Sequence, residues 1–204
     1  MAKTFLDKTY GKLDSDAVTA HYDDWAASYD AEIAENGYAT PGRCAAALAR
    51  HLEDKASPIL DFGCGTGLSG LALAREGFTT IDGIDPSAEM LAQARSRGLY
   101  RNLTHIAPGA DIPGTSGRYA AICAIGVIGV GAAPPAVMDQ IMAALTPGGL
   151  FVFSLNDHAL ADAPTAAARD ALLASGVAVQ AEQSYGTHLP GINLKSSVYV
   201  YVKL

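Results

Sequence analysis

The sequence predicts an α/β fold, a doubly wound, mostly parallel sheet of seven strands that has an antiparallel strand at its C-terminal edge. Two observations carry this prediction. Short apolar runs alternate with helix-like segments from residue 41 to residue 174, which is the pattern of strand–helix–strand units. Beyond residue 176, apolar and polar residues alternate over 177–185 and 195–203, which is typical of an antiparallel pair that closes a sheet.

The elements follow one another with recognisable boundaries. Pro41 begins a helix that runs to about Leu52, because proline fits the first turn of a helix. Pro58 precedes the first strand, 59–62, and Gly77 ends the helix that follows it, 66–76. The other expected strands are 79–84, 103–107, 119–125 and 150–155, and the other expected helices are 87–97, 135–145 and 164–174.

The first 40 residues differ from the rest. Residues 1–35 are richer in Asp, Lys and Tyr, and we expect them to form helices outside the main core. We therefore expect a helical extension over 1–40, which can act as a lid, and a ligand-binding domain over 41–204. Residues 1–5 lack the apolar core of a signal peptide.

Composition restricts the partners of the chain. Its formal net charge is −7 with 14 Lys and Arg residues, which is unfavourable for binding a long phosphate backbone. We expect a small-molecule substrate and no nucleic acid. The long uncharged stretch 119–138 is expected to be a buried strand plus loop rather than a membrane span, because it contains glycines and the Pro134–Pro135 pair. The oligomeric state is not predictable.

The cysteines indicate a reducing compartment. Cys44, Cys64 and Cys123 form no CxxC pair, and no histidine lies at a spacing typical of zinc ligands. We expect reduced thiols, a cytoplasmic location and no metal.

The most informative motif follows the first expected strand. Residues 59–67 read ILDFGCGTG, so an apolar run ends in Asp61 and glycines stand at every second position after it. Such a turn lets a ligand lie against bare backbone. A second acid, Asp85, ends the next expected strand. Because parallel strands bring their carboxyl ends to one edge, both acids are expected to face one ligand.

The register of the glycines bears on which ligand this is. Counted from Gly65, the spacing Gly-x-Gly-x-x-Gly matches the dinucleotide fingerprint, with Asp85 20 residues later. That fingerprint normally begins directly after the strand, which here is Gly63, and its third glycine then falls on Leu68. This register argues against a dinucleotide.

Asp61 separates the candidate ligands further. A carboxylate at the mouth of a phosphate cradle repels a pyrophosphate but suits an ammonium group. S-adenosylmethionine carries an amino group and ribose hydroxyls and no phosphate, and Asp85 would bind the hydroxyls. We favour this ligand. A nicotinamide dinucleotide stays open, as does a plain tight turn in which Asp61 caps the next helix.

Three blocks in combination resemble a known family. They read ILDFGCGTG at 59–67, IDGIDPSAEMLAQA at 81–94 and LTPGGLF at 145–151. The chain resembles the class I S-adenosylmethionine-dependent methyltransferases, whose fold is Rossmann-like. The segments YDDWAASYD at 22–30 and GLY at 98–100 resemble, more narrowly, the Williams–Beuren-region methyltransferase-like group.

The resemblance implies a set of cofactor-binding residues. Asp61 and Gly63 would border the methionine amino group, Gly65 and Gly67 would give backbone clearance, and Asp85 would bind the ribose. Further positions implied are Pro86 and Met90 near the adenine, Ala110 and Asp111 near its amine, and Ile125 beside the site of methyl transfer. The loop after Ile125 lacks the Asn-Pro-Pro-Tyr of amino-methylating enzymes, which argues against methylation of nucleic-acid bases.

Aromatic and histidine residues are the candidates for catalysis. Tyr22, Trp25 and Tyr29 share one helical face, where the tyrosines either cover the cofactor or anchor the helix. His158 follows the fifth expected strand and is a candidate general base, although a helix cap by Asn156 or Asp157 explains this segment better. We expect His188 to lie in a surface loop.

These observations favour methyl transfer from S-adenosylmethionine to a small acceptor, with O-, N- and S-methylation all open. Two alternatives remain: a nicotinamide-dependent oxidoreductase, and a non-catalytic protein that binds S-adenosylmethionine or S-adenosylhomocysteine.

Overall fold

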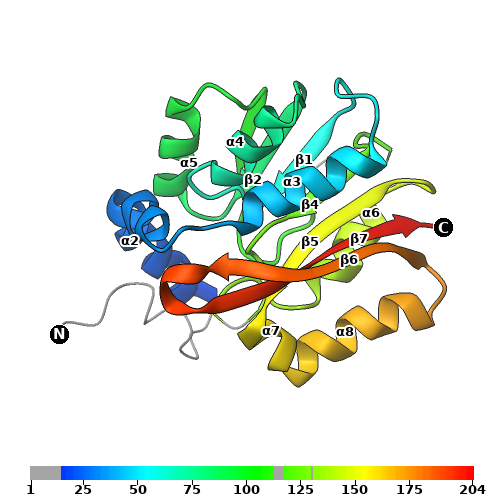
Figure 1. Ribbon diagram of the computed structural model, residues 1–204. Coiled ribbons are helices and arrows are strands. Elements are labelled where there is room, and N and C mark those ends of the chain that lie inside the picture. Colours follow the sequence, from blue (N-terminus) through cyan, green and yellow to red (C-terminus); the bar gives the residue numbers. More distant parts are fainter. Residues whose placement is uncertain (1–14, 113–116, 130) are drawn as a thin grey trace.

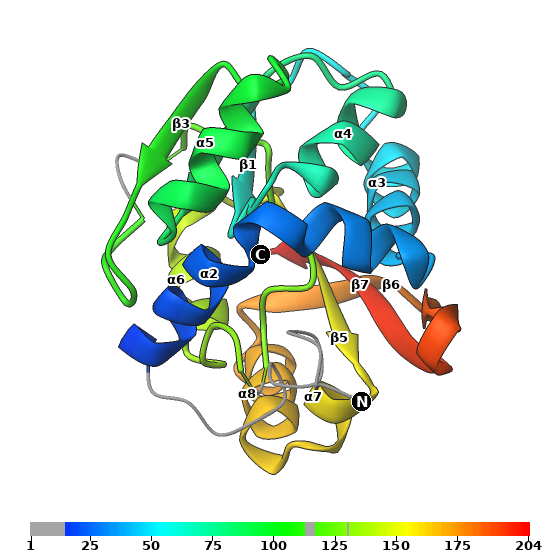
Figure 2. The ribbon, with the colours of Figure 1, turned by 90° about the vertical axis from the view of Figure 1, so that its left-hand side faces the viewer.

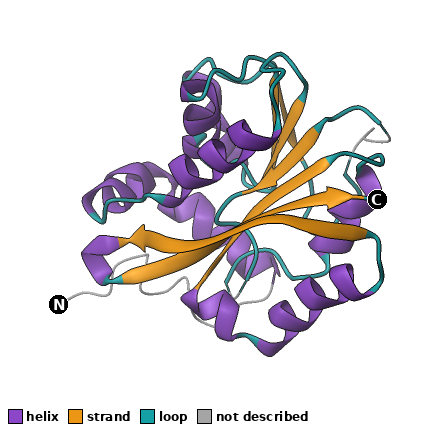
Figure 3. Ribbon diagram, turned by 45° about the vertical axis from the view of Figure 1, so that its right-hand side comes forward, coloured by secondary structure: helices purple, strands orange, loops and turns teal. Residues whose placement is uncertain are grey.

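The computed structural model describes residues 15–112, 117–129 and 131–204, and it has a seven-stranded sheet between layers of helices (Figures 1 and 3). Residues 1–14 of the expected extension lie outside the described residues. The strands are β1 Ile59–Phe62, β2 Ile81–Asp85, β3 Asn102–His105, β4 Ala121–Ala124, β5 Leu150–Asn156, β6 Ala178–Leu189 and β7 Leu194–Lys203. The helices are α2 Ser15–Glu35, α3 Thr40–His51, α4 Leu68–Arg75, α5 Ala88–Ser96, α6 Val137–Ala144, α7 Asp157–Ala161 and α8 Ala163–Ala174, with a 3₁₀ turn at Pro190–Ile192.

The predicted sheet is confirmed. Its strand order is β3-β2-β1-β4-β5-β7-β6, with β1 to β5 parallel and β7 antiparallel to both of its neighbours. The antiparallel C-terminal strand lies one place inside the edge, and β6 forms the edge itself. Burial explains this order: β7 is apolar and buried on both faces from Val198 to Tyr201, whereas β6 is mostly exposed on one face.

Helices cover both faces of the sheet, as a doubly wound fold requires. On one face α3 and α4 bring Leu48 and Leu73 against Ile59 of β1 and Val200 of β7. On the other face α6 and α8 pack on an aromatic stack in which the ring of Phe153 lies 4.5 Å from that of Phe151 and 4.9 Å from that of Tyr199, between centroids. The uncharged stretch 119–138 forms β4, a loop and the start of α6, and no helix in the described part of the chain is long and apolar enough to cross a membrane.

Several boundaries differ from those expected, and two of the differences bear on the site. The helix expected at 66–76 begins at Leu68, because Gly67 adopts φ +90° and ends the glycine turn in a left-handed conformation. The strand expected to end at residue 185 continues to Leu189, where it still pairs with Leu194 of β7. The placement of His188 in a surface loop is therefore wrong: this side chain is 5% exposed, near the end of a paired strand.

Helix α2 lies across the carboxyl ends of the strands. Figure 2 shows it in front of the sheet, reaching from the side of α5 toward the tip of the β6–β7 hairpin. At the hairpin, Trp25 and Ile33 pack on Leu189 and Leu194. At the other side, Gln93 of α5 donates a hydrogen bond to the carbonyl of Ala26. The helix thus bridges the two halves of the sheet.

Candidate functional site

The main pocket opens at the topological switch of the sheet. The chain runs from β1 outward through β2 to β3 and then returns to place β4 on the other side of β1. In parallel sheets this arrangement leaves a crevice beyond the carboxyl ends of the central strands, where ligands bind. Here the crevice is lined by the ends of β1 and β2, by the loops after β3 and β4, and by α2.

The glycine turn forms the floor of this pocket. Gly63 and Gly65 both have positive φ, +69° and +52°. A Cβ atom on Gly63 would lie 2.6 Å from Cγ2 of Val127, in the loop after β4. Gly65 lines the pocket, and a Cβ atom there would meet no atom within 4 Å. The turn therefore needs glycine for its backbone conformation and presents bare peptide groups to a ligand.

Asp85 lies at the tip of β2 and lines the pocket. Its Oδ2 accepts a hydrogen bond from the Gly65 N–H at 2.8 Å, and its Oδ1 accepts one from the Ser87 N–H at 2.8 Å. Each carboxylate oxygen keeps a second lone-pair direction for a ligand donor. Burial raises the pKa of Asp85 to about 6, although both backbone hydrogen bonds oppose this.

Asp61 lies behind the glycine turn, fully buried, and does not line the pocket. Its Oδ2 accepts hydrogen bonds from Ser69 Oγ at 2.6 Å and Tyr100 Oη at 2.7 Å. Its Oδ1 is buried and has no hydrogen-bond partner among the described residues. Burial raises the pKa of Asp61 to about 6, and the nearby charge of Asp85 adds to this. A buried carboxylate oxygen without a donor is costly in the free protein, and it suits a donor supplied by a ligand.

The structure brings most of the predicted site residues to one pocket. Those that line it are Tyr22, Tyr29, Gly63, Gly65, Asp85, Pro86, Met90, Ala110 and Ile125. Gly67 does not line it, since a Cβ atom there would point at Arg97 and Tyr100. Asp111 is exposed and also lies outside the lining.

His158 does not line the main pocket. It is exposed on α7 and lines neither of the two cavities described here. Asn156 accepts a hydrogen bond from the Ala159 N–H at 3.0 Å, so the helix-cap interpretation of this segment is confirmed.

A second cavity adjoins the first on the side of β5 and the β6–β7 hairpin. We call it the aromatic chamber; its ring-bearing walls are Tyr22, Trp25, Tyr29, Tyr38 and His188, and its polar walls include Ser154 and Asn156. Both cavities are lined by Tyr22, Tyr29 and Tyr38, which makes them neighbours around one set of rings.

Sequence reasoning missed Tyr38 and placed His188 wrongly in a surface loop. Tyr38 follows the end of α2, and its hydroxyl occupies the space beside Gly126, where a Cβ atom would lie 2.2 Å from it. One signal for His188 was present: residues 184, 186 and 188 continue the alternation of inward positions in β6.

Comparison with known proteins decides the family. The sequence pattern of the methyltransferase domain family matches residues 37–196, which is most of the chain. The chain belongs to this family. The match covers the chain from α3 to the start of β7, and the resemblance seen in the sequence is confirmed.

The curated relatives differ in what they methylate. Human methyltransferase-like protein 27 is 33% identical over 63% of this chain and 54% of its own length. The yeast 18S rRNA (guanine(1575)-N(7))-methyltransferase is 43% identical over 34% of this chain and 26% of its own. A Streptomyces fradiae dTDP-3-amino-3,6-dideoxy-alpha-D-glucopyranose N,N-dimethyltransferase is 38% identical over 39% of this chain and 34% of its own. The chain spans about half or less of the length of these relatives.

Solved structures show the same fold at low sequence identity. The (4+2)-cyclase SpnF aligns over 94% of this chain and 97% of its own, with a TM-score of 0.69 and 15% identity. The magnesium protoporphyrin IX methyltransferase of Synechocystis, solved with bound S-adenosylmethionine, aligns over 98% and 90% with a TM-score of 0.60 and 15% identity. These likenesses support the fold, which in different proteins hosts different reactions.

S-adenosylmethionine is the cofactor of this family, and the residues of the main pocket fit it. Asp85 in the lining can accept from ribose hydroxyls, and the unpartnered Oδ1 of Asp61, which lies behind the lining, has the chemistry to accept from a cationic amino group. The pocket has no lysine or arginine among its described lining residues, and the buried carboxylates of Asp61 and Asp85 beside the glycine turn disfavour a pyrophosphate. The family and this chemistry together set aside the nicotinamide dinucleotide.

Proposed function

We propose that the methyltransferase domain transfers the methyl group of S-adenosylmethionine to a small-molecule acceptor. The observation that carries the proposal is the position of α2, because Tyr22 and Tyr29 of this helix line the pocket opposite the glycine turn. An acceptor has to fit the room between α2 and the sheet, which favours a small molecule over a polymer. O-, N- and S-methylation all fit this arrangement.

The proposed division of labour follows the layout of the pocket. Asp61 and Asp85 would hold the amino group and the ribose of S-adenosylmethionine, and Gly63 and Gly65 would give its backbone clearance. Pro86, Met90 and Ala110 would contact the adenine, and Ile125 would border the site of transfer. Bound S-adenosylmethionine supplies an activated methyl group, so the chain mainly has to align the acceptor and exclude water.

We propose that residues 1–40 serve as a lid on a binding domain formed by 41–204. The described part of this lid is α2 with the connection to α3. Tyr22 and Trp25 stack with ring centroids 5.9 Å apart, and Trp25 meets Tyr29 edge-on at 4.7 Å. This aromatic row is continuous along the underside of the helix, so it can cover a ligand and exclude water from it. The buried thiols of Cys44, Cys64 and Cys123 support the proposal of a cytoplasmic location.

Nucleic acid is a poor fit as the acceptor. A polymer acceptor needs a basic face, and the chain carries a formal net charge of −7. The described lining of both cavities contains no lysine or arginine. The yeast relative that acts on 18S rRNA makes RNA the acceptor class against which this proposal has to be tested.

Calorimetry on cofactor binding tests the donor half of the proposal. Wild-type protein should bind S-adenosylmethionine and S-adenosylhomocysteine but not NADH. Asp85→Asn removes one carboxylate oxygen and the negative charge, so its affinity for both ligands should fall by roughly tenfold or more. Asp139→Asn, an exposed acid on α6, is the matched control and should bind like wild type. A thermal melt of each variant checks folding.

Two outcomes would contradict the proposal that S-adenosylmethionine is the methyl donor and that Asp85 binds it. NADH binding without S-adenosylmethionine binding would restore the dinucleotide interpretation. Unchanged affinity in a folded Asp85→Asn variant would remove the proposed role of Asp85. Turnover with any acceptor would in turn exclude a protein that only binds the cofactor.

A further inference from the structure

The aromatic chamber has uncharged walls. Its described lining contains no Asp, Glu, Lys or Arg side chain, and Asp85 is the one charged side chain in the described lining of the main pocket beside it. A phosphate group brought into the chamber would lose its hydration and gain no cationic partner, which is costly. The chamber therefore disfavours nucleotides, sugar nucleotides and other phosphorylated acceptors.

The walls of the chamber are rich in flat rings. The rings of Tyr22 and Trp25 lie within 26° of parallel, and Tyr38 meets His188 edge-on with centroids 5.2 Å apart. Aromatic side chains favour flat, apolar ligands that can stack or meet their edges. Cations also bind aromatic faces, so the polar groups of the chamber have to decide between the two.

A chain of hydrogen bonds leads to the imidazole of His188. Arg43 Nη1 donates to Ser196 Oγ at 3.0 Å, Ser196 Oγ lies 2.9 Å from Thr40 Oγ1, and Thr40 Oγ1 lies 2.7 Å from His188 Nδ1. Arginine can only donate. Every hydroxyl proton of this chain finds an acceptor only if Ser196 donates to Thr40 and Thr40 donates to His188 Nδ1.

This direction of donation assigns the tautomer of His188. A neutral imidazole that accepts at Nδ1 carries its proton on Nε2. Burial lowers the pKa of His188 to about 4, which keeps the ring neutral near pH 7. No described residue hydrogen-bonds to Nε2, and His188 lines the chamber, so its N–H is available to a ligand there.

A second polar side chain of the chamber, Asn156, also favours a ligand that accepts a hydrogen bond. Asn156 uses its Oδ1 to cap α7, which leaves its amide nitrogen as the donor that faces away from the cap. An N–H donor favours a ligand oxygen and disfavours a cation, which has no lone pair to offer. The chamber thus combines flat apolar walls with N–H donors.

We propose that the aromatic chamber is the methyl-acceptor site, and that it takes small, flat, uncharged molecules whose oxygen accepts a hydrogen bond from His188 Nε2–H. Phenols and hydroxylated or carbonyl-bearing heteroaromatic compounds have this chemistry. The proposal rests on the proposed function, because it assigns the acceptor half of the same site. In it His188 selects and positions the acceptor.

A set of matched one-ring probes tests this assignment by saturation-transfer NMR on protein loaded with S-adenosylhomocysteine. The probes are phenol, toluene, phenyl phosphate and benzylamine, which differ in the oxygen and in charge. Phenol should bind at least roughly tenfold more tightly than phenyl phosphate and benzylamine. In His188→Phe, phenol should lose roughly tenfold in affinity, while toluene, which accepts no hydrogen bond, should stay within about twofold.

Two further variants keep the test sharp. His51→Phe replaces a histidine on α3 that pairs with Glu182 on the outer surface, and it should leave all four affinities unchanged. Thr40→Val removes the hydroxyl that donates to His188 Nδ1 and keeps the imidazole in place. It should therefore also lower the affinity for phenol relative to that for toluene. It serves as the second variant if His188→Phe fails to fold.

The outcomes separate the two proposals. If S-adenosylhomocysteine does not bind to wild-type protein, the proposed function fails. If it binds but phenyl phosphate or benzylamine binds as tightly as phenol, the proposed acceptor class is wrong. An equal loss of affinity for phenol and for toluene in His188→Phe would show that His188 only fills space.

Discussion

Three buried aspartates in two neighbouring strands show how surroundings decide the chemistry of a carboxyl group. Asp82 is buried, which raises its pKa, but hydrogen bonds from Arg101, Asn102 and Tyr119 outweigh this and lower the pKa to about 2. Among the described residues no lysine or arginine pairs with Asp61 or Asp85, and burial raises the pKa of each to about 6, although His105 opposes this rise at Asp85. The first is a structural ion pair, and we propose that the other two accept hydrogen bonds from a ligand.

These two raised pKa values predict opposite pH effects on stability and on binding. For each, the folded-state pKa of about 6 lies above the ordinary aspartate value of 3.8, so between these values the folded protein binds more protons than the unfolded one. The free energy of unfolding of the ligand-free protein should therefore rise as pH falls through this window, as far as these groups decide it. In the proposed function both carboxylates bind S-adenosylmethionine in their ionised form, so its affinity should fall over the same window.

Calorimetry at about pH 7.5 and about pH 5 checks this, with an expected loss of roughly tenfold in affinity for S-adenosylmethionine. Asp61→Asn keeps the shape of the side chain and removes one titrating group, so its affinity should be lower at the higher pH and should change less between the two. An affinity that is equal at both pH values in the wild type would mean that neither carboxylate contacts the ligand as an ion.

At the scale of residues, the sequence predicts the proposed S-adenosylmethionine site better than the proposed site of the methyl acceptor. Asp61, Asp85 and the glycines belong to one strand–turn–helix unit, so their spacing alone predicts that they converge. His188 meets Thr40 across 148 positions of sequence, and this contact depends on where the β6–β7 hairpin turns. No local sequence pattern predicts a contact between residues so far apart in the chain.

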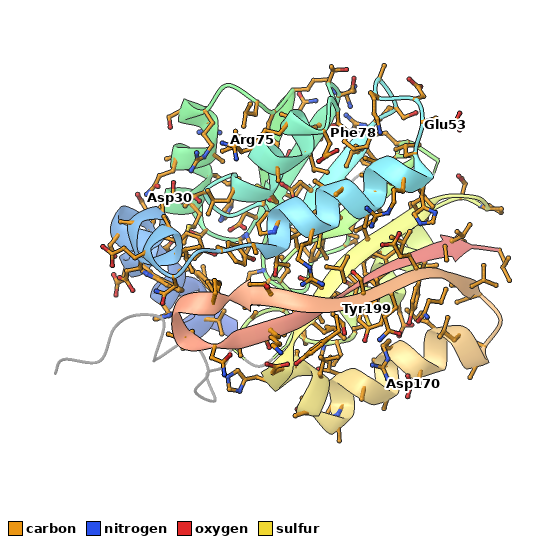
Figure 4. The ribbon with its side chains drawn as sticks, in the orientation of Figure 1. Asp30, Glu53, Arg75, Phe78, Asp170 and Tyr199 are labelled. Atoms are coloured by element: carbon orange, nitrogen blue, oxygen red, sulfur yellow. The ribbon has the colours of Figure 1, made fainter. Side chains whose placement is uncertain are left out.

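At the scale of elements, one polar cluster ties α2 to the glycine turn. Asp30 of α2 accepts a hydrogen bond from Thr66 Oγ1 at 2.6 Å and pairs with Arg97 (Asp30 is labelled in Figure 4). Arg97 Nε in turn donates to the Thr66 carbonyl at 2.6 Å. The Asp30 side chain is 40% exposed, so the ion pair stabilises the fold by less than about 1 kcal/mol. It can nevertheless hold the helix over the pocket.

Asp30→Ala should loosen α2 without unfolding the domain. We expect amide exchange to speed up in residues 15–35 and S-adenosylhomocysteine to dissociate several-fold faster, with a change in global stability below about 1 kcal/mol. Hydrogen-exchange mass spectrometry and stopped-flow displacement measure these effects.

Asp170→Ala is the matched control, because it also removes an exposed partner of an arginine, Arg169, but on α8 (Figure 4). It should change neither quantity. If Asp30→Ala behaves like this control, the polar cluster does not hold α2 over the pocket.

The elements themselves were largely predictable, because their signals are local. Apolar runs bounded by Pro58 and Gly77 predicted β1 and α4 to within about two residues. The place of β7 inside the edge was not predictable in the same way. Both β6 and β7 alternate in sequence, and only the burial of Val198 to Tyr201 on both faces shows which of them lies inside.

At the scale of the whole molecule, family and fold identify the methyl donor. The methyl acceptor has to be inferred from the residues that line the site. Fold neighbours include a cyclase and a methyltransferase of a porphyrin, so the sheet alone selects no acceptor. Three features of this chain bear on the acceptor: its acidic net charge, the helix across the strand ends, and a chamber whose described walls carry no Asp, Glu, Lys or Arg side chain. Together they favour a small neutral acceptor.

The most direct test of this account follows the methyl group itself. The protein is incubated with S-adenosylmethionine labelled in its methyl group, together with a cell extract divided into small molecules, RNA and protein. The account predicts that label enters the small-molecule fraction, in neutral aromatic compounds, and that Asp85→Asn abolishes most of it. Label in RNA or in protein, with none in the small molecules, would contradict the account.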